Sequence, residues 1–298
     1  MTYLAQFQNV YHVDEIQSGI YQKGNKSWLD LKYHHSLNVL SLGDVLIQNE
    51  PSLSCLSDEK KQIIRFALLL HDVGRAFEKD EHGKTIPFFL HGAEGMHYLK
   101  SEFLIEDIAI LAAVMVHDRL DFDFLTLPEE DLKTHSLFQQ ISKSAQKSVI
   151  ELNQKFHLLS DSEKSFVIST CYLVKDADTL SNIQIFQKLL SLSTASQRAK
   201  VSTNVLRSIR ARSYVDYSDI QTLPDQGLTY FGWMFRFYYN ATRKFVFEEN
   251  FPFLIKDYII QELEKNTQNQ KAEILEVASF YDEAISLLKS NTSFTYLS

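Results

Sequence analysis

The sequence predicts an all-helical protein, and three observations support this fold class. The 298 residues include only nine glycines and five prolines, whereas sheet-rich folds need many tight turns. Apolar residues recur at helical spacing, beginning with Leu31, Val39 and Leu42, whose face also includes His35. Hydrophobic residues make up 45% of the chain and aromatic residues 12%. This content is enough for a substantial core packed between helices.

The first long helix is expected to follow a weakly periodic N-terminal segment, residues 1–27. This segment ends in Gly24-Asn25-Lys26-Ser27, which has the composition of a loop. The helix then begins near Ser27, and helical spacing places His35 on its apolar, inward face. Residues 51–54, Pro-Ser-Leu-Ser, are expected to form a turn.

The next helix is expected to end in the protein interior. Ser57 caps it, and its first turn is acidic, as the positive end of the helix dipole favours. Residues 63–70 are almost entirely apolar, so this end of the helix is expected to be buried. The helix therefore delivers His71 and Asp72 into the core, and Gly74 follows as a helix breaker.

The later elements carry the remaining residues of chemical interest. They are expected to be a polar loop at 78–88, a helix at about 90–104 with His91, an apolar helix at about 106–116 followed by His117, a helix from 128 into the 140s, and a helix at about 162–180 with Asp178.

The pattern changes after about residue 193. The basic stretch 198–212 is expected to be an exposed connection, and residues 227–290 return to helices with an aromatic core. Nothing between these segments has the length of an interdomain linker. We therefore predict that residues 191–298 form a helical cover packed on residues 1–190, within one structural domain.

Composition limits the partners and the compartment. The net charge of −8 argues against nucleic acid, which proteins bind mostly through Lys and Arg, but a bound metal would still make a pocket attractive to a small anion. Cys55 and Cys171 lie in apolar surroundings and are expected to be buried, reduced thiols. No signal peptide and no run of roughly 18 apolar residues is visible. We therefore expect a cytoplasmic protein without a membrane partner.

Six residues from five segments form a candidate metal site. Histidine and ionised aspartate are costly to bury without a partner, yet several of these residues stand at buried helix ends or on inward faces. A shared metal ion explains all of these placements. Imidazole and carboxylate together suit first-row metals such as Mn, Fe, Co, Ni or Zn, and six ligands could hold two ions with one carboxylate bridging. The candidate ligands are His35, His71, Asp72, His91, His117 and Asp178.

Three further residues are weaker candidates. Arg75 follows His71 by four residues, and its guanidinium could clamp phosphate oxygens or form an ordinary salt bridge. Lys175 is a candidate for binding an anion. Asp176 could be a general base or a partner of a metal ligand, although a structural role is the simpler interpretation. The other histidines are interpreted as surface or structural residues; they are His12, His34, His82, His97, His135 and His157.

These motifs resemble the HD-domain superfamily of metal-dependent phosphohydrolases, whose pattern is H…HD…D. The matching segments are His35-Ser36, Leu-Leu-His-Asp-Val-Gly-Arg at 69–75, and Lys-Asp-Ala-Asp-Thr-Leu-Ser-Asn at 175–182. The additional segments His-Gly-Ala-Glu-Gly at 91–95 and Val-His-Asp at 116–118 resemble the subgroup with two metal ions. The resemblance covers roughly residues 30–185. It implies an HD-type metal-binding catalytic region in a helical bundle, with a C-terminal helical extension.

Departures from the family patterns reduce the number of candidate activities. Val-Gly-Arg follows Asp72, in place of the Gly-Tyr-Pro of cyclic-di-GMP phosphodiesterases. Phosphonate-cleaving di-iron oxygenases of this superfamily carry a lysine shortly after the second middle histidine, whereas residues 118–121 here are Asp-Arg-Leu-Asp. An oxygenase acting on a small polar substrate therefore stays an alternative. A non-catalytic regulatory module that binds a nucleotide or metal is a second alternative.

The resemblance implies a phosphohydrolase acting on a nucleotide or another small phosphate ester. One metal would be held by His35, His71, Asp72 and Asp178, and a second by Asp72, His91 and His117, with Mg as an alternative ion there. A metal-activated water would attack phosphorus, and Arg75 would stabilise charge on the phosphate oxygens. The sequence is compatible with two roles for the C-terminal helices, a cover over the catalytic region or an interface in a homo-oligomer.

Overall fold

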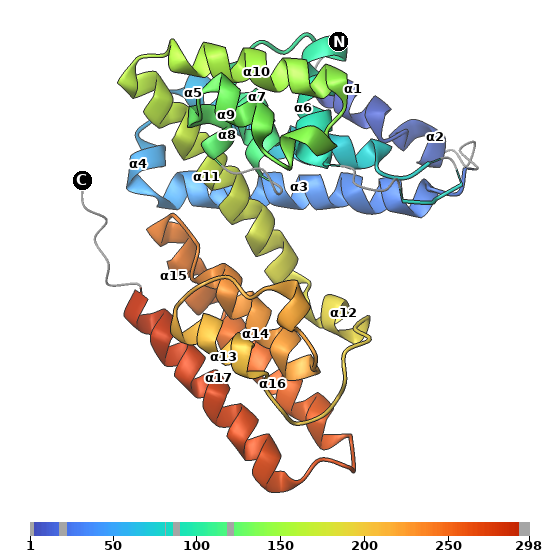
Figure 1. The fold of residues 1–298 in the computed structure, drawn as a ribbon, viewed down its shortest axis with the longest axis vertical. Coiled ribbons are helices and arrows are strands. Elements are labelled where there is room, and N and C mark those ends of the chain that lie inside the picture. Colours follow the sequence, from blue (N-terminus) through green and yellow to red (C-terminus); the bar gives the residue numbers. More distant parts are fainter. Residues whose placement is uncertain (1–2, 18–22, 81, 86–89, 118–121, 292–298) are drawn as a thin grey trace. The chain divides into compact units, whose positions relative to one another are not determined.

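The computed structural model describes residues 3–17, 23–80, 82–85, 90–117 and 122–291. Helices account for the regular structure of these residues, and their β pairing is limited to the isolated bridges Lys79–Thr85 and Ser196–Thr222. The all-helical fold class is therefore confirmed (Figure 1). The chain divides into two compact units, residues 1–178 and 179–298. The predicted packing of residues 191–298 on the rest stays a prediction.

Unit 1 contains the segments that carry the candidate ligands. Its elements are α1 (Tyr3–Val10), α2 (Val13–Gln17), α3 (Lys26–Asn49), α4 (Pro51–Ser54), α5 (Asp58–Leu70), the 3-10 helix η1 (Val73–Phe77), α6 (His91–Glu102), α7 (Ile108–Val116), α8 (Asp123–Thr126), α9 (Glu129–Thr134), the 3-10 helix η2 (Phe138–Gln140), α10 (Lys143–His157) and α11 (Asp161–Gln184), which continues into the second unit.

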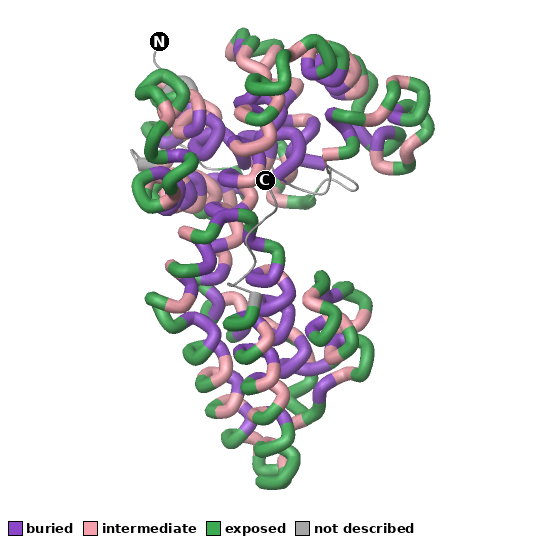
Figure 2. The backbone as a smooth tube through the Cα atoms, turned by 90° about the vertical axis from the view of Figure 1, so that its left-hand side faces the viewer, coloured by how far each residue is buried: buried purple, intermediate pink, exposed green. Residues whose placement is uncertain are grey.

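Helix α7 forms the centre of unit 1. Asp107 caps it by accepting hydrogen bonds from the backbone N–H groups of Ala109 and Ile110, and every residue from 109 to 116 is buried. A helix that is apolar all round must be surrounded by other elements, and α5, α6 and α10 pack against it. Figure 2 shows the buried residues running through the interior of this unit.

The structure confirms the expected start of α5. The Ser57 hydroxyl accepts a hydrogen bond from the backbone N–H of Lys60, and the helix ends at Leu70 with His71 as its C-cap. Gly43 lies within α3 and does not end it. Helix α5 is so close at this point that a Cβ atom on Gly43 would lie 2.2 Å from a methyl carbon of Leu68. This close approach brings the two helices that carry His35 and His71 together.

Several local predictions were wrong for identifiable reasons. The helix expected from 128 into the 140s ends at Thr134, and a new helix begins at Lys143 because the Ser142 hydroxyl caps it. Residues 51–54 form one turn of helix, and Gly74 lies within a 3-10 helix instead of ending an element. In the polar loop expected at 78–88, residues 81 and 86–88 lie outside the described residues.

Unit 2 is a second helical assembly. Its elements are α12 (Phe186–Ser191), α13 (Thr203–Arg210), the 3-10 helix η3 (Tyr217–Asp219), α14 (Leu223–Met234), α15 (Asn240–Glu248), α16 (Phe251–Glu264) and α17 (Lys271–Asn291). The exposed connection expected at 198–212 was wrong in part, because Val205 and Ile209, four residues apart, form a buried stripe on α13. Thr222 and Asp225 form a capping box at the start of α14, and the Asp225 carboxylate also accepts hydrogen bonds from the backbone and the hydroxyl of Ser202, the residue before α13.

None of the described helices is both long and apolar enough to cross a membrane.

The two cysteines lie in different environments. Cys171 is completely buried on α11, and burial raises the pKa of its thiol to about 12. Cys55 follows the one-turn helix α4 and is exposed, so its predicted burial was wrong. The apolar neighbour Leu53 points into the core, whereas Cys55 lies two residues farther along and faces solvent.

This difference predicts selective thiol labelling. The folded protein should react with one equivalent of Ellman's reagent within minutes, because Cys55 is exposed and Cys171 is both inaccessible and protonated. Cys55→Ser should remove this fast reaction, whereas Cys171→Ser should retain it. Two fast equivalents in the folded wild-type protein would contradict the assignment.

Candidate metal centre

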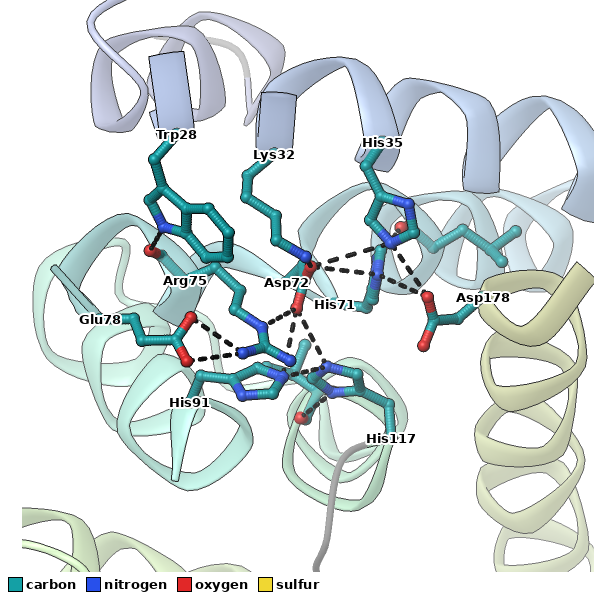
Figure 3. Close-up of polar contacts among 12 residues, drawn as sticks. Trp28, Lys32, His35, His71, Asp72, Arg75, Glu78, His91, His117 and Asp178 are labelled. Carbon is teal, nitrogen blue, oxygen red and sulfur yellow. Dashed lines mark hydrogen bonds and ion pairs between the residues drawn. The ribbon is translucent and has the colours of Figure 1, made fainter. Parts of the chain in front are cut away.

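Five helices and one 3-10 turn bring the six candidate ligands into one cluster (Figure 3). His35 comes from α3, His71 and Asp72 from the end of α5, and Asp178 from α11. His91 is the first residue of α6 and His117 follows the last residue of α7. Two overlapping groups have ligand atoms within 4.8 Å of one another: His35, His71 and Asp178, and His71, Asp72 and His117.

The Asp72 carboxylate stands between the two groups. Its Oδ2 lies 3.8 Å from Nε2 of His35 and 4.0 Å from Nε2 of His71. On the same side, Asp178 Oδ1 lies 2.9 Å from Nε2 of His35 and 3.8 Å from Nε2 of His71. Three side chains and one oxygen of Asp72 therefore face a common point.

The other oxygen of Asp72 faces the remaining two histidines. Its Oδ1 lies 3.2 Å from Nε2 of His91 and 3.3 Å from Nε2 of His117. The two Nε2 atoms are themselves 3.0 Å apart. His91 thus joins this group through Asp72 and His117, and one carboxylate presents a separate oxygen to each set of imidazoles.

The hydrogen bonds of two histidines point their Nε2 lone pairs into the cluster. Nδ1 of His71 donates to the Leu68 carbonyl at 2.8 Å, and Nδ1 of His117 donates to the Val114 carbonyl at 2.7 Å. A backbone carbonyl only accepts, so the proton of the neutral ring is on Nδ1 in each case. Metal-ligating histidines are fixed in this way by a hydrogen bond from their other nitrogen.

The state of His71 favours a cation at this place. Burial lowers the pKa of its imidazole to about 3, against the opposing effect of Asp72 and Asp178, so the ring is neutral. Its Nε2 is buried and has no hydrogen-bond partner among the described residues. A lone pair directed at two carboxylates without an intervening proton is repelled by them, whereas a metal ion would satisfy all three groups.

Both aspartates of the cluster are ionised. Burial alone raises the pKa of Asp72, but the Lys32 ammonium, 3.0 Å from Oδ2, holds it well below its usual value. Burial opposes ionisation of Asp178 in the same way, and the hydrogen bond from His35 with the nearby imidazoles lowers its pKa. The donor set is therefore two carboxylates and four imidazoles, which fits a first-row divalent metal.

Glycines allow the helices that carry these ligands to approach closely. A Cβ atom on Gly74 would lie 2.0 Å from the carbonyl oxygen of His91, and one on Gly92 would lie 2.6 Å from that of Met115. Helix α6 therefore packs against both η1 and α7 at van der Waals distance of backbone atoms. This packing places His91 next to Asp72 and His117.

Three residues that were not predicted from the sequence contact Asp72 or its loop. Lys32 Nζ donates to Asp72 Oδ2 at 3.0 Å, the Tyr11 hydroxyl donates to the Asp72 carbonyl at 2.8 Å, and the Trp28 indole donates to the Arg75 carbonyl at 2.9 Å. Spacing could have indicated Lys32, because it lies one turn before His35 on the same helix.

The weaker candidates have different surroundings. Arg75 Nε donates to Asp72 Oδ1 at 3.3 Å, and its Nη1 donates to both carboxylate oxygens of Glu78 at 2.7 and 2.8 Å. Lys175 places its ammonium 5.4 Å from the centre of the Phe122 ring. Asp176 is buried on α11 but is not in either ligand group of the described residues. The catalytic or anion-binding roles of these residues stay predictions.

One protein family matches the chain over the region of the candidate ligands. The model of the HD domain matches residues 33–183, which is half of the chain and includes all six candidate ligands. The chain belongs to the HD-domain family. Most members of this family are metal-dependent phosphohydrolases, and HD domains bind divalent metals. No curated protein and no solved structure gave a significant match to the chain.

The glycine contacts predict a specific loss of stability. Gly74→Ala forces a Cβ atom against the His91 carbonyl, a backbone atom that cannot rotate away. We expect the free energy of unfolding in urea to fall by about 3 kcal/mol, the upper part of the range for overpacking. The control is Gly43→Ala, whose Cβ meets only the mobile end of Leu68 and should cost clearly less. An equal loss in both variants would contradict this account.

Proposed function

We propose that this HD-domain protein is a metal-dependent phosphohydrolase that cleaves a nucleotide or another small phosphate ester. His35, His71, Asp72 and Asp178 would hold one divalent metal ion, and Asp72, His91 and His117 would hold a second. Asp72 would bridge the two ions through its separate oxygens.

The observation that carries the proposal is the division of the Asp72 carboxylate between two sets of imidazoles. Oδ2 faces Nε2 of His35 and His71, and Oδ1 faces Nε2 of His91 and His117, at 3.2 to 4.0 Å. A single ion would need only one of these sets. A bridging carboxylate between two nitrogen-rich sets is the arrangement expected of a two-metal hydrolytic site.

The chain's own residues prepare the site for an anionic substrate. Bound divalent ions would acidify a water molecule and withdraw charge from the phosphate oxygens. The carbonyls of Leu68 and Val114 hold the rings of His71 and His117 in the tautomer that leaves Nε2 free of a proton. Arg75 is held by Glu78 beside Asp72, and its guanidinium would stabilise the charge that develops on the phosphate oxygens during attack.

Removing the bridging carboxylate should abolish both metal binding and phosphate hydrolysis. Asp72→Ala is expected to lose its bound metal and to lower phosphate release by more than about a hundredfold, since even outer-shell partners of ligands cost 10–100-fold. Metal content by mass spectrometry and phosphate release are the two measurements. The control Asp30→Ala removes an exposed carboxylate from α3 that pairs with His34 and should change neither. Retained hydrolysis with intact metal in Asp72→Ala would refute the proposal.

The reaction class can be tested by varying oxygen. We expect close to two metal ions per chain and phosphate release from a panel of nucleotides and a generic phosphate ester, at the same rate in aerobic and anaerobic samples. Hydrolysis by activated water consumes no oxygen, whereas a di-iron oxygenase requires it. Two irons with oxygen uptake and no phosphate release would replace the hydrolase with the oxygenase. Tight nucleotide binding without turnover would indicate the regulatory module.

A further inference from the structure

A row of cationic and aromatic side chains lies beside the candidate metal centre. Lys32 Nζ is 3.0 Å from Asp72 Oδ2 and 5.1 Å from the centre of the Trp28 ring. Lys79 Nζ is 4.5 Å from the centre of the same ring. Two ammonium groups therefore lie close to one indole ring, and one of them also contacts the Asp72 carboxylate. Figure 3 shows Trp28 and Lys32 side by side on α3, both turned toward the loop that carries Asp72 and Arg75.

The position of the indole is fixed from two sides. Trp28, Lys32 and His35 follow one another at intervals of four and three residues, so they share one face of α3. The Trp28 N–H donates to the Arg75 carbonyl at 2.9 Å, which ties the ring to η1. The ring is only partly buried, so its remaining surface and the ammonium groups beside it can contact a ligand.

The charges of this row are not all balanced in the same way. Both oxygens of Glu78 accept from Arg75 Nη1, so the guanidinium has a carboxylate that is not a candidate ligand. Lys32 is paired with Asp72, the carboxylate that the metal ions would share. Its side chain is only 16% exposed, and a divalent ion on Asp72 Oδ2 would leave the charge of this largely buried lysine in need of another anion.

We propose that Lys32, Trp28 and Lys79 form a subsite for a diphosphate-type anion, so that the substrate carries at least two linked phosphate groups. Lys32 binds the phosphate next to Asp72, and Lys79, the other ammonium group close to the Trp28 ring, binds the second phosphate. The inference names the substrate class of the hydrolase proposed above and rests on that proposal.

The chemistry of the two lysines supports a phosphate chain over a single phosphate. A single phosphate beside Asp72 can contact Lys32 and Arg75. A contact with Lys79 as well requires a second, linked phosphate. Trp28 keeps both ammonium groups within 5.1 Å of its centre, because the face of an aromatic ring attracts cations.

The test compares two inorganic probes, pyrophosphate and orthophosphate, by calorimetric titration of the full-length protein with its metal content measured before and after. The wild-type protein should bind pyrophosphate at least about tenfold more tightly than orthophosphate, because charge-assisted contacts to the second phosphate are added. Lys79→Gln should weaken pyrophosphate binding by about tenfold and leave orthophosphate binding unchanged. Lys32→Gln should weaken the binding of both anions.

Lys84→Gln is the matched control. Lys84 is an exposed lysine on the same loop, so its substitution removes the same charge without reaching the Trp28 ring. Equal affinities of the wild-type protein for the two anions would overturn the inference, and so would an equal effect of Lys79→Gln and Lys84→Gln on pyrophosphate binding.

The outcomes also separate this inference from the proposed function. Release of phosphate from esters without a preference that depends on Lys79 would overturn the subsite and leave the hydrolase standing. A preference for pyrophosphate that depends on Lys79, in a protein that hydrolyses no ester, would establish the anion subsite and refute the hydrolase.

Discussion

The site depends on one constraint, an ionised aspartate buried within a cluster of imidazoles. Asp72 is 3% exposed and His71 is fully buried. Without a cation, the carboxylate and the imidazole lone pairs would repel one another in a medium of low dielectric constant. Lys32 and Arg75 offset part of this cost through their ion pairs with Asp72. A divalent metal would offset the rest, so metal binding and the stability of unit 1 should be linked.

The surrounding helices are organised to maintain this unfavourable arrangement. The apolar helix α7 delivers His117 at its end, and α5 delivers His71 and Asp72 in the same manner. Gly74 and Gly92 allow backbone to pack against backbone, which leaves the histidines little freedom to move apart. Functional sites held on rigid elements keep their geometry better than sites on loops. The close backbone contacts at Gly74 and Gly92 therefore position the candidate ligands as well as filling the core of unit 1.

The sequence predicted the parts of this site that have a local cause. His71 and Asp72 follow an uninterrupted apolar run, and the Ser57 cap marks where that helix begins. The signals for Lys32 and Trp28 are weaker: their spacing places them on the face of His35, but a lysine and a tryptophan three and seven residues before a histidine also occur on ordinary half-exposed helices. Their role becomes visible only when η1 packs against α3. The break between α9 and α10 was missed because capping by Ser142 outweighed the continuity of the helical pattern.

The cationic row also shows why overall charge is a poor guide to the ligand of a buried site. The chain carries a net charge of −8, which disfavours long polyanions at its surface. A compact anion inside the site instead experiences the few charges that face it through apolar surroundings, and these include Lys32, Arg75 and Lys79. Metal ions bound to Asp72 would compensate its negative charge. The two lysines would then be available to bind the ligand. A net negative charge is therefore compatible with a site for a small phosphate chain.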